Sequence, residues 1–444
     1  MAERRPRVVI VGGGFGGLAA AKALGRAPAD VILIDRNDHH VFQPLLYQVA
    51  TAVLTPSQIG SAIRSIVRDQ KNTTVLKCNV TGVDVDQHRV FVDSVDRERV
   101  PLNYDFLVLA TGVRHSYFNH PEFERFAPGL KSLTDAVLIR NRILQAFEQA
   151  ETEADPSKHQ DLLTFVLVGA GPTGVEMAGA LAILVRSMLR EEYRRVDPAT
   201  ARIVLVDMMP KVLGTFADAL SSAARARLER LGVEVRLGHG VDLIDGEGVV
   251  IAGERIASKT VIWTAGVAPS PAGKWLAAPT DRAGRVRVEK DLSVAQHPEV
   301  FVVGDTASLD QDGKPLPGVA QVAMQQGRYV GNVLLCRLNG QAAPTPFRYF
   351  DKGNMAVVGK GFAVLQSGRI RLSGFVPWLM WAAVHLQFLA QSYLRVSVFL
   401  QWIWTYLTGK RGSRLIINPP SISLAPEPAN LSPQALPQQQ LSRT

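Results

Sequence analysis

The sequence predicts an α/β fold in which two tandem Rossmann-like dinucleotide-binding domains are followed by an apolar C-terminal helical region. A Gly-x-Gly-x-x-Gly fingerprint occurs twice, at residues 12–17 and 169–174, and each copy follows an apolar β-branched run. An aspartate ends the next apolar run after each fingerprint, which is the position of a ribose contact. Residues 374–407 then become strongly apolar and rich in tryptophan.

The bulk composition limits the classes of protein that are possible. A length of 444 residues allows two or three domains with separate cores. The net charge of +9 is compatible with a nucleic acid, an anionic membrane surface or an acidic ligand. Only two cysteines, Cys78 and Cys336, are present, which excludes a disulfide framework, a Cys-x-x-Cys redox pair and a multi-cysteine metal site. No metal site is predicted, and the absence of a leader before residue 8 leads us to expect a cytoplasmic catalytic body.

The first fingerprint lies in a predicted βαβ unit. Its elements are a strand at 8–11, a helix at 18–24 and a strand at 31–34. Gly12 permits the tight turn, Gly14 allows close approach to a pyrophosphate, and Gly17 allows close helix packing. The diphosphate is then expected on the helix N-terminus, with Asp35 accepting hydrogen bonds from a ribose.

The second fingerprint repeats this plan with Gly169, Gly171 and Gly174. The predicted elements are a strand at 163–168, a helix from Val175 to about Arg195 and a strand at 202–206. Asp207 ends that strand and would repel a 2′-phosphate, so we prefer NADH to NADPH. Lys211 is the nearby cation that argues in the other direction. Two such loops suggest two nucleotide cofactors held face to face, which is the arrangement in which a nicotinamide reduces a flavin.

Further cofactor contacts are expected where other apolar strands end. A strand at 104–109 runs into a turn formed by Ala110, Thr111 and Gly112. Residues 261–266 repeat a similar turn, which ends at Gly266. A late strand at 300–303 is followed by Gly304 and Asp305. Asp305 suits the ribityl hydroxyls of a flavin. A helix begins at Val319, and its N-terminus, which includes Ala320, is expected to face the flavin edge where negative charge grows on reduction.

Three polar side chains are candidates for the chemistry. Glu176 lies two residues after the second fingerprint, where it either handles a proton or is a solvated helix residue. Gln321 and Gln325 share one helical face, and each amide is able to donate to a quinone carbonyl, although most helical glutamines are exposed and idle. Hydride transfer itself needs no side-chain nucleophile.

The C-terminal region at 377–407 combines tryptophans and other aromatics with leucines and valines, but has no clean apolar stretch of ~20 residues to span a bilayer. Helices lying in the membrane interface fit better, with Lys410, Arg411 and Arg414 beside anionic lipid; the alternative is a core or dimer-interface helix pair. This placement gives the basic charge a membrane interpretation, and no nucleic-acid motif is found. Residues 418–444 are predicted to be a disordered tail.

With these residues in place, the chain resembles the type II NADH:quinone oxidoreductases over roughly residues 7–417. The resemblance rests on the stretch 39–50, the loop with its glutamate at 169–176, the run 303–305 and the block 350–359. The most specific piece is Ala-Gln-Val-Ala-Met-Gln-Gln at 320–326, which is similar to the family's quinone-site signature. Asp207 departs from the family, where a glutamate is commoner.

The resemblance implies a non-proton-pumping enzyme that passes hydride from NADH to FAD and then two electrons to a membrane quinone. It implies an FAD-binding domain in two parts (1–160 and 276–345), an NADH-binding domain (161–275) and a membrane-anchoring region (346–417). It also implies a peripheral, monotopic protein on the cytoplasmic face of the inner membrane, which binds the lipid surface. A homodimer is a further expectation. The alternatives are sulfide:quinone or another flavin-dependent NAD(P)H oxidoreductase, or a redox-sensing flavoprotein.

Overall fold

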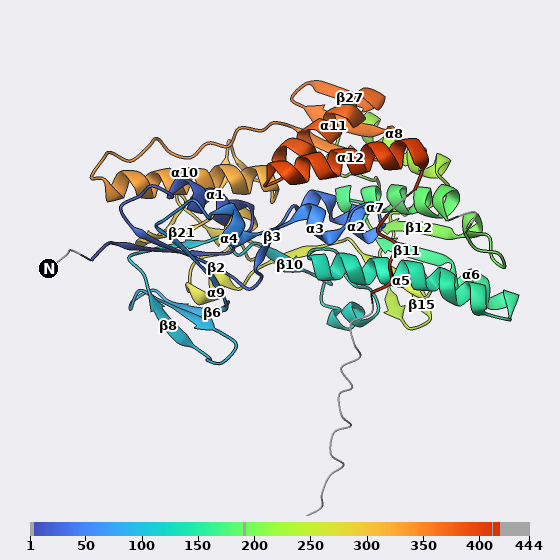
Figure 1. Cartoon of the computed structure of the whole chain (residues 1–444), viewed down its shortest axis with the longest axis horizontal. Helices are drawn as coiled ribbons and strands as arrows, with labels where there is room; N and C mark the ends of the chain where they lie inside the picture. Colours follow the sequence, from blue (N-terminus) through green and yellow to red (C-terminus); the bar gives the residue numbers. More distant parts are fainter. Residues whose placement is uncertain (1–3, 190–191, 411, 418–444) are drawn as a thin grey trace, which may run out of the picture.

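The computed structural model describes residues 4–189, 192–410 and 412–417. Within these residues, two α/β units lie side by side along the long axis of the molecule (Figure 1). The first unit contains the N-terminal fingerprint and the second contains the other, so the predicted pair of Rossmann-like units is confirmed. The predicted tail at 418–444 lies outside the described residues.

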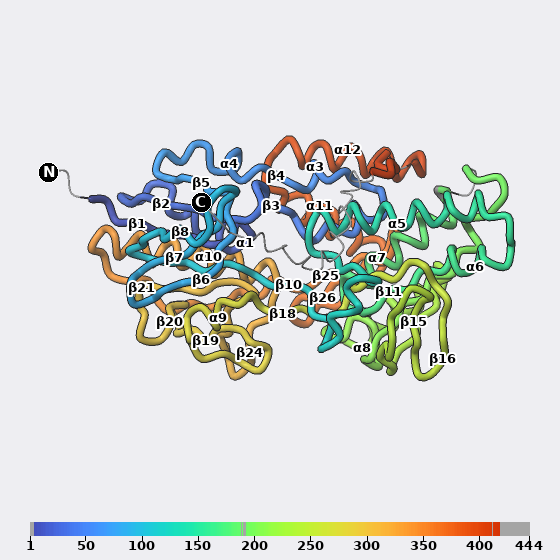
Figure 2. The backbone as a smooth tube through the Cα atoms, turned by 90° about the horizontal axis from the view of Figure 1, so that it is seen from below, coloured from blue at the N-terminus to red at the C-terminus, as the bar shows by residue number. Residues whose placement is uncertain are grey.

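The first unit is built on a six-stranded sheet. Its strands are, in spatial order, β20 (Ser293–Val294), β21 (His297–Val302), β9 (Phe106–Leu109), β1 (Arg7–Val11), β2 (Asp30–Asp35) and β5 (Thr73–Lys77). The described strands pair in parallel except for the edge strand β20. The late strand β21 pairs with the early strand β9, so segments far apart in the sequence share one sheet (Figure 2).

The second unit is built on a four-stranded parallel sheet of β13 (Val233–Leu237), β12 (Arg202–Asp207), β11 (Thr164–Val168) and β17 (Thr260–Trp263), in that order. Every residue of β11 is buried, which explains its continuous apolar sequence. Helix α8 (Asp218–Arg230) packs against β13. An antiparallel ribbon of β10 (Val113–His115) and β18 (Val267–Pro269) joins the two units.

Two helices of the first unit approach each other unusually closely. Helix α1 (Phe15–Ala23) packs along α10 (Ala320–Leu338), and the two lie side by side in Figure 1. A β-carbon on Gly327 would lie 2.0 Å from the Gly16 carbonyl oxygen, and one on Gly331 would lie 2.5 Å from the Ala23 β-carbon. Small residues at these positions therefore bring the start of α10 next to the first glycine loop.

The helix after the second fingerprint is shorter than predicted. Helix α7 spans Pro172–Ile183 and continues as a π-helical turn over Leu184–Met188, so the predicted end near Arg195 is wrong. The Ser187 hydroxyl donates to the Ile183 carbonyl, which competes with the helical ladder. Arg186 also donates to the Gly232 carbonyl, and this tertiary bond favours the widened turn.

Smaller elements complete the body. They are β3 (His39–Val41), α2 (Leu46–Ala50), α3 (Pro56–Ile59), β4 (Gly60–Ala62), α4 (Ile63–Ile66), β6 (Asn79–Asp84), β7 (Arg89–Asp93), β8 (Val100–Asn103), α5 (Leu133–Thr152), α6 (His159–Leu162), β14 (Leu243–Asp245), β15 (Gly248–Ile251), β16 (Glu254–Ala257) and α9 (Ala272–Trp275). The segment at 156–160 forms a 3₁₀ turn and the start of α6.

The apolar C-terminal region forms a hairpin-like sheet and two helices. They are β25 (Asn354–Val357), β26 (Ala363–Ser367), β27 (Ile370–Gly374), α11 (Phe375–Phe388) and α12 (Ser392–Thr408). Helix α12 packs against α3, and α11 packs against the sheet of β25, β26 and β27. Figure 1 draws both helices above α2, α3 and α7. Among the described residues, none of the helices combines the length and the apolar character that crossing a bilayer requires.

Candidate active site

The first glycine loop forms a cradle at the end of β1. Gly12 has a φ of 106°, which favours glycine, and a β-carbon there would lie 2.3 Å from the Ala110 carbonyl oxygen. A β-carbon on Gly17 would lie 1.8 Å from the Gly12 oxygen, whereas one on Gly14 would meet no described atom within 4 Å. Asp35 accepts from the Gly13 amide at 2.6 Å. Open space therefore lies where a diphosphate would approach the start of α1.

The second glycine loop has the same geometry at the end of β11. Gly169 has a φ of 108°, and a β-carbon on Gly174 would again lie 1.8 Å from the first glycine's oxygen. No described atom lies within 4 Å of the position of a β-carbon on Gly171. Asp207 accepts from the Ala170 amide at 2.5 Å and from the Met209 amide at 2.8 Å. Both loops thus fit a dinucleotide by the same criteria.

The strand order gives each dinucleotide a direction. In the first unit Asp35 ends β2, so the adenosine half belongs above β2 and the other half extends past β1 towards β9 and β21. In the second unit Asp207 ends β12, so the other half extends past β11 towards β17. The β10–β18 ribbon joins the segments that follow β9 and β17. The two reactive halves therefore meet where the units join.

The predicted turn residues gather at this junction. Thr306 donates to the Gly112 carbonyl at 2.9 Å, and the Thr111 and Thr306 hydroxyls are 3.3 Å apart. Thr111 also contacts the Ser270 hydroxyl, at 2.5 Å. The turn with Gly266 is equivalent, because the Thr264 amide donates to Val168 as the Ala110 amide donates to Val11. Tertiary structure thus brings residues 110–112 and 304–306 together, whereas Gly266 lies on the other unit's side.

Asp305 lies next to Gly304 among charged groups that the sequence analysis missed. Burial raises the pKa of the Asp305 carboxyl, and the positive charges of Lys131 and Arg285 oppose that rise. The Gly304 amide donates to the Gln326 side chain at 2.7 Å, so Gln326 fixes the turn. Gln326 lies inside the 320–326 run and was open to detection, whereas Lys131 carries no sequence signal that links it to Asp305.

The two glutamines of α10 reach the same segment but in different ways. Gln321 donates to the Gly353 carbonyl at 3.2 Å, and its buried Oε1 finds no hydrogen-bond partner among the described residues. Gln325 both donates to the Phe350 carbonyl and accepts from the Phe350 amide, each at 3.0 Å. Both Nε2 and Oε1 of Gln325 therefore have a partner in Phe350, whereas Oε1 of Gln321 has none among the described residues. Ala320 begins the helix, one residue after the predicted start at Val319, which is the N-cap.

Glu176 is buried between α7 and the C-terminal region. The Val357 amide of β25 donates to its Oε1 at 3.3 Å. Burial raises the pKa of Glu176 to about 8, while contacts with the Val357 amide and the Trp381 indole of α11 act in the opposite direction. The carboxyl is therefore largely protonated at neutral pH, and the alternative of a solvated helix residue is wrong.

The helices α11 and α12 present a broad exposed apolar surface. Its members are Phe375, Val376, Leu379, Met380, Phe388, Tyr393, Val396, Phe399, Leu400, Ile403, Trp404, Tyr406 and Leu407. An apolar patch on this scale marks an interaction surface. The inner sides of the helices are anchored, since the Trp402 indole donates to Gln48 at 2.7 Å.

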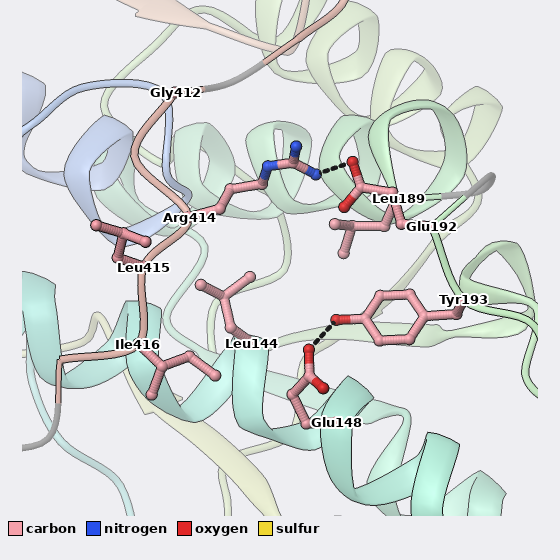
Figure 3. Close-up of a pocket in the computed structure, with 9 residues that line it drawn as sticks. All are labelled: Leu144, Glu148, Leu189, Glu192, Tyr193, Gly412, Arg414, Leu415 and Ile416. Carbon is pink, nitrogen blue, oxygen red and sulfur yellow. Dashed lines mark hydrogen bonds and ion pairs between the residues drawn. The ribbon is translucent and has the colours of Figure 1, made fainter.

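A cavity of about 320 Å³ lies away from the glycine loops, where residues 412–416 cross α5 (Figure 3). Arg414 forms an ion pair with Glu192 there, and Tyr193 donates to Glu148 at 2.9 Å. Arg414 is therefore engaged by protein, which corrects its predicted place beside lipid. Arg411 lies outside the described residues.

Comparisons with known proteins agree with this geometry. The sequence profile of the pyridine nucleotide-disulphide oxidoreductases matches residues 6–327. Two type II NADH:quinone oxidoreductases of Mycobacterium tuberculosis are 44% and 43% identical to the chain, across 93% of it and 90% and 89% of the relatives. The solved structure of NDH2 from Plasmodium falciparum in complex with NADH has a TM-score of 0.84 at 20% identity, across 94% of this chain and 100% of that one. Sulfide:quinone oxidoreductase of Aquifex aeolicus follows the same fold, with a TM-score of 0.67 at 16% identity, across 91% and 95% of the two chains.

Proposed function

The chain belongs to the pyridine nucleotide-disulphide oxidoreductases, among the type II NADH:quinone oxidoreductases, and on this premise we propose that it oxidises NADH and reduces a membrane quinone without pumping protons. The observation that carries the proposal is the junction at which the open halves of two dinucleotide cradles meet. FAD, when bound, supplies the two-electron chemistry between the nicotinamide and the quinone.

The first unit holds FAD. Gly14 leaves room for its diphosphate at the N-terminus of α1, Gly12 and Gly17 allow the tight turn and the close helix packing that form the cradle, and Asp35 takes its ribose. Ala110–Gly112 and Gly304–Asp305 lie along the path of its flavin half, and Ala320 opens the helix that faces that half. We propose the two-part FAD domain and the inserted NADH domain with the limits expected from the sequence.

The second unit holds NADH. Gly171 leaves the same room for a diphosphate, and Gly169 and Gly174 form the turn and the close helix packing around it. Gly266 follows the strand over which the nicotinamide half extends. Asp207 is an acceptor for a free 2′-hydroxyl and repels a 2′-phosphate. Lys211 is engaged by Asp218 at 2.8 Å and by the Phe216 carbonyl, which supports the preference for NADH.

Quinone reduction uses the side of the junction that faces the C-terminal region. The Gln321 Nε2 has a second N–H, beyond its bond to Gly353, for a quinone carbonyl, and its unpartnered Oε1 is able to accept from a quinol hydroxyl. Gln325 holds the Phe350 segment beside it. Glu176, protonated at neutral pH, holds a proton next to the second glycine loop, at residues 169–174. Reduction of a quinone to a quinol consumes two protons, so a protonated carboxyl near this path suits the reaction.

The exposed apolar surface of α11 and α12 seats the protein on a bilayer. We propose a monotopic attachment in which this surface enters the interface and brings the start of α10, with Gln321, within reach of the lipid-soluble quinone. We place this attachment on the cytoplasmic face of the inner membrane, and the homodimer remains a prediction from the sequence.

The positions of the cysteines weigh against a sulfide:quinone activity. The Cys78 amide donates to the Asp35 carbonyl at 3.0 Å, so Cys78 lies at the adenosine end of the FAD cradle. Cys336 lies about 24 Å along α10 from Ala320, at 1.5 Å per residue. Neither thiol is near the flavin half, where a redox cysteine would be needed.

The two half-reactions test the proposal. Mixing the purified protein with NADH bleaches the yellow flavin, and adding a soluble quinone restores the colour. Gln321→Ala slows the second step about tenfold, as expected for one lost hydrogen bond, and leaves the first step unchanged. Gln87→Ala, in the exposed turn after β6, is the matched control. Bleaching by NADH without reoxidation by any quinone would refute the assignment of the acceptor.

A further inference from the structure

The turn after β10 has an unusual backbone. The His120 amide donates to the Tyr117 carbonyl at 3.0 Å, and the two residues between them have positive φ angles, 48° at Phe118 and 72° at Asn119. Two successive left-handed residues make a mirror-image turn, which normally selects Asn-Gly. Asparagine tolerates this conformation, but phenylalanine is strained in it.

Burial of the ring does not explain this strain. Phe118 is 58% exposed, so little apolar surface is removed from water in return. The ring instead lies against Gly266, where a β-carbon would come 2.5 Å from Phe118 Cζ. The Trp263 ring lies beneath it, with the centroids 6.1 Å apart. A strained residue that keeps an aromatic ring at the surface is typical of a functional position.

The segment around the turn fixes the ring to both units. The Ser116 amide donates to the Gly266 carbonyl at 3.3 Å, and the Trp263 indole donates to the Ser116 carbonyl at 3.0 Å. The turn therefore belongs to the first unit by sequence and to the edge of the second unit by contact. Its ring contacts Gly266, at the end of β17, past which the nicotinamide half of NADH is expected to extend.

We propose that Phe118 is the outer wall of the nicotinamide subsite and holds NADH in it. This inference rests on the proposed function of the second unit. An aromatic ring there excludes water from one side of the nicotinamide and limits its departure from the flavin. The strained turn keeps the ring in this place before NADH arrives, so that binding does not have to order it.

The test compares Phe118→Gly with the wild-type enzyme in steady-state assays with a saturating quinone. Glycine accepts the positive φ and removes the ring, so we expect the KM for NADH to rise about tenfold, kcat to change less than twofold and the thermal unfolding midpoint not to fall. Phe118→Leu, which keeps an apolar side chain, should be intermediate. Leu138→Ala removes another exposed apolar side chain, on α5, and is the matched control.

The outcomes separate the two proposals. A wild-type enzyme that does not couple NADH oxidation to quinone reduction contradicts the proposed function. An active wild-type enzyme whose KM for NADH is unchanged or lowered in Phe118→Gly overturns the role of Phe118. A parallel fall of the unfolding midpoint and of activity in both Phe118 variants also overturns it, because the ring would then be structural.

Discussion

The two glycine loops are nearly identical in backbone geometry and differ in what surrounds them. Gly12 and Gly169 have φ angles of 106° and 108°, and Gly17 and Gly174 leave the same gap of 1.8 Å to a hypothetical β-carbon. Their helices then meet different partners. Helix α1 is packed along α10 through glycine and alanine, whereas α7 carries a buried carboxyl against the C-terminal region.

This difference matches the different tasks of the two sites. The residue two positions after Gly17 is Ala19, and the residue two positions after Gly174 is Glu176. A cofactor that stays bound needs only a fitted cradle, and the first loop is enclosed by packing. A substrate that comes and goes beside proton chemistry has a titratable group at the corresponding place. The loop sequence therefore defines a nucleotide site, and its surroundings define the use of that site.

The largest expected effect comes from adding one methyl group to each loop. Gly17→Ala places a β-carbon 1.8 Å from the Gly12 carbonyl oxygen, a backbone atom that cannot move aside without distorting the loop, and should leave the purified protein without FAD. Gly174→Ala should retain FAD, seen by its absorbance, but lose its reduction by NADH. Loss of FAD from both variants would contradict the proposal that the first loop binds FAD and the second loop binds NADH.

The next effect concerns the residue that distinguishes the loops. Glu176→Gln should slow quinone-coupled turnover on the order of 100-fold, the range for one general acid or base. Flavin content should stay unchanged, and Ala19→Gly in the first loop's helix is the matched control. Turnover equal to that of the wild type would show that the buried carboxyl handles no proton in the reaction.

The same variant tests the electrostatics through stability. The pKa of Glu176 is about 8 in the folded protein and about 4.3 in an unfolded chain, so the folded state holds a proton that the unfolded state has released. Wild-type stability should therefore fall as the pH rises from about 4.3 to 8, and level off above that. In Glu176→Gln this fall should be smaller, so thermal unfolding should favour the variant more at pH 9 than at pH 5.

The smallest expected effect comes from the matched aspartates. Asp207→Asn should raise the KM for NADH about tenfold, in line with the loss of a hydrogen bond to a charged group, and should narrow the preference over NADPH. Asp35→Asn should weaken FAD retention and leave the KM for NADH unchanged. A change of nucleotide preference in Asp35→Asn, measured by the ratio of kcat/KM values, would contradict the assignment of the two loops.

Much of the fold was predictable from the sequence because it depends on local rules. Apolar runs in the sequence predict the strands β1, β2, β11 and β12, and the two glycine fingerprints predict the loops that follow β1 and β11. The end of α7 was not predictable, because its apolar pattern continues while Ser187 and Arg186 draw the chain into a wider turn. The role of Lys131 was not predicted because its partner, Asp305, is distant in the sequence. The role of Gln326 was not predicted because the 320–326 motif was assigned to the quinone through Gln321 and Gln325 instead.

The sequence by itself determined the two nucleotide cradles, the aspartate of each and the apolar C-terminal helices, since each is encoded by residues close together along the chain. Only the tertiary structure decided that residues 110–112 and 304–306 meet, that Glu176 is buried and protonated, and that the Gln325 amide is already occupied. These properties depend on burial and on contacts between distant segments. Such contacts set the pKa of a carboxyl and the free hydrogen-bonding capacity of an amide, and the linear pattern does not record them.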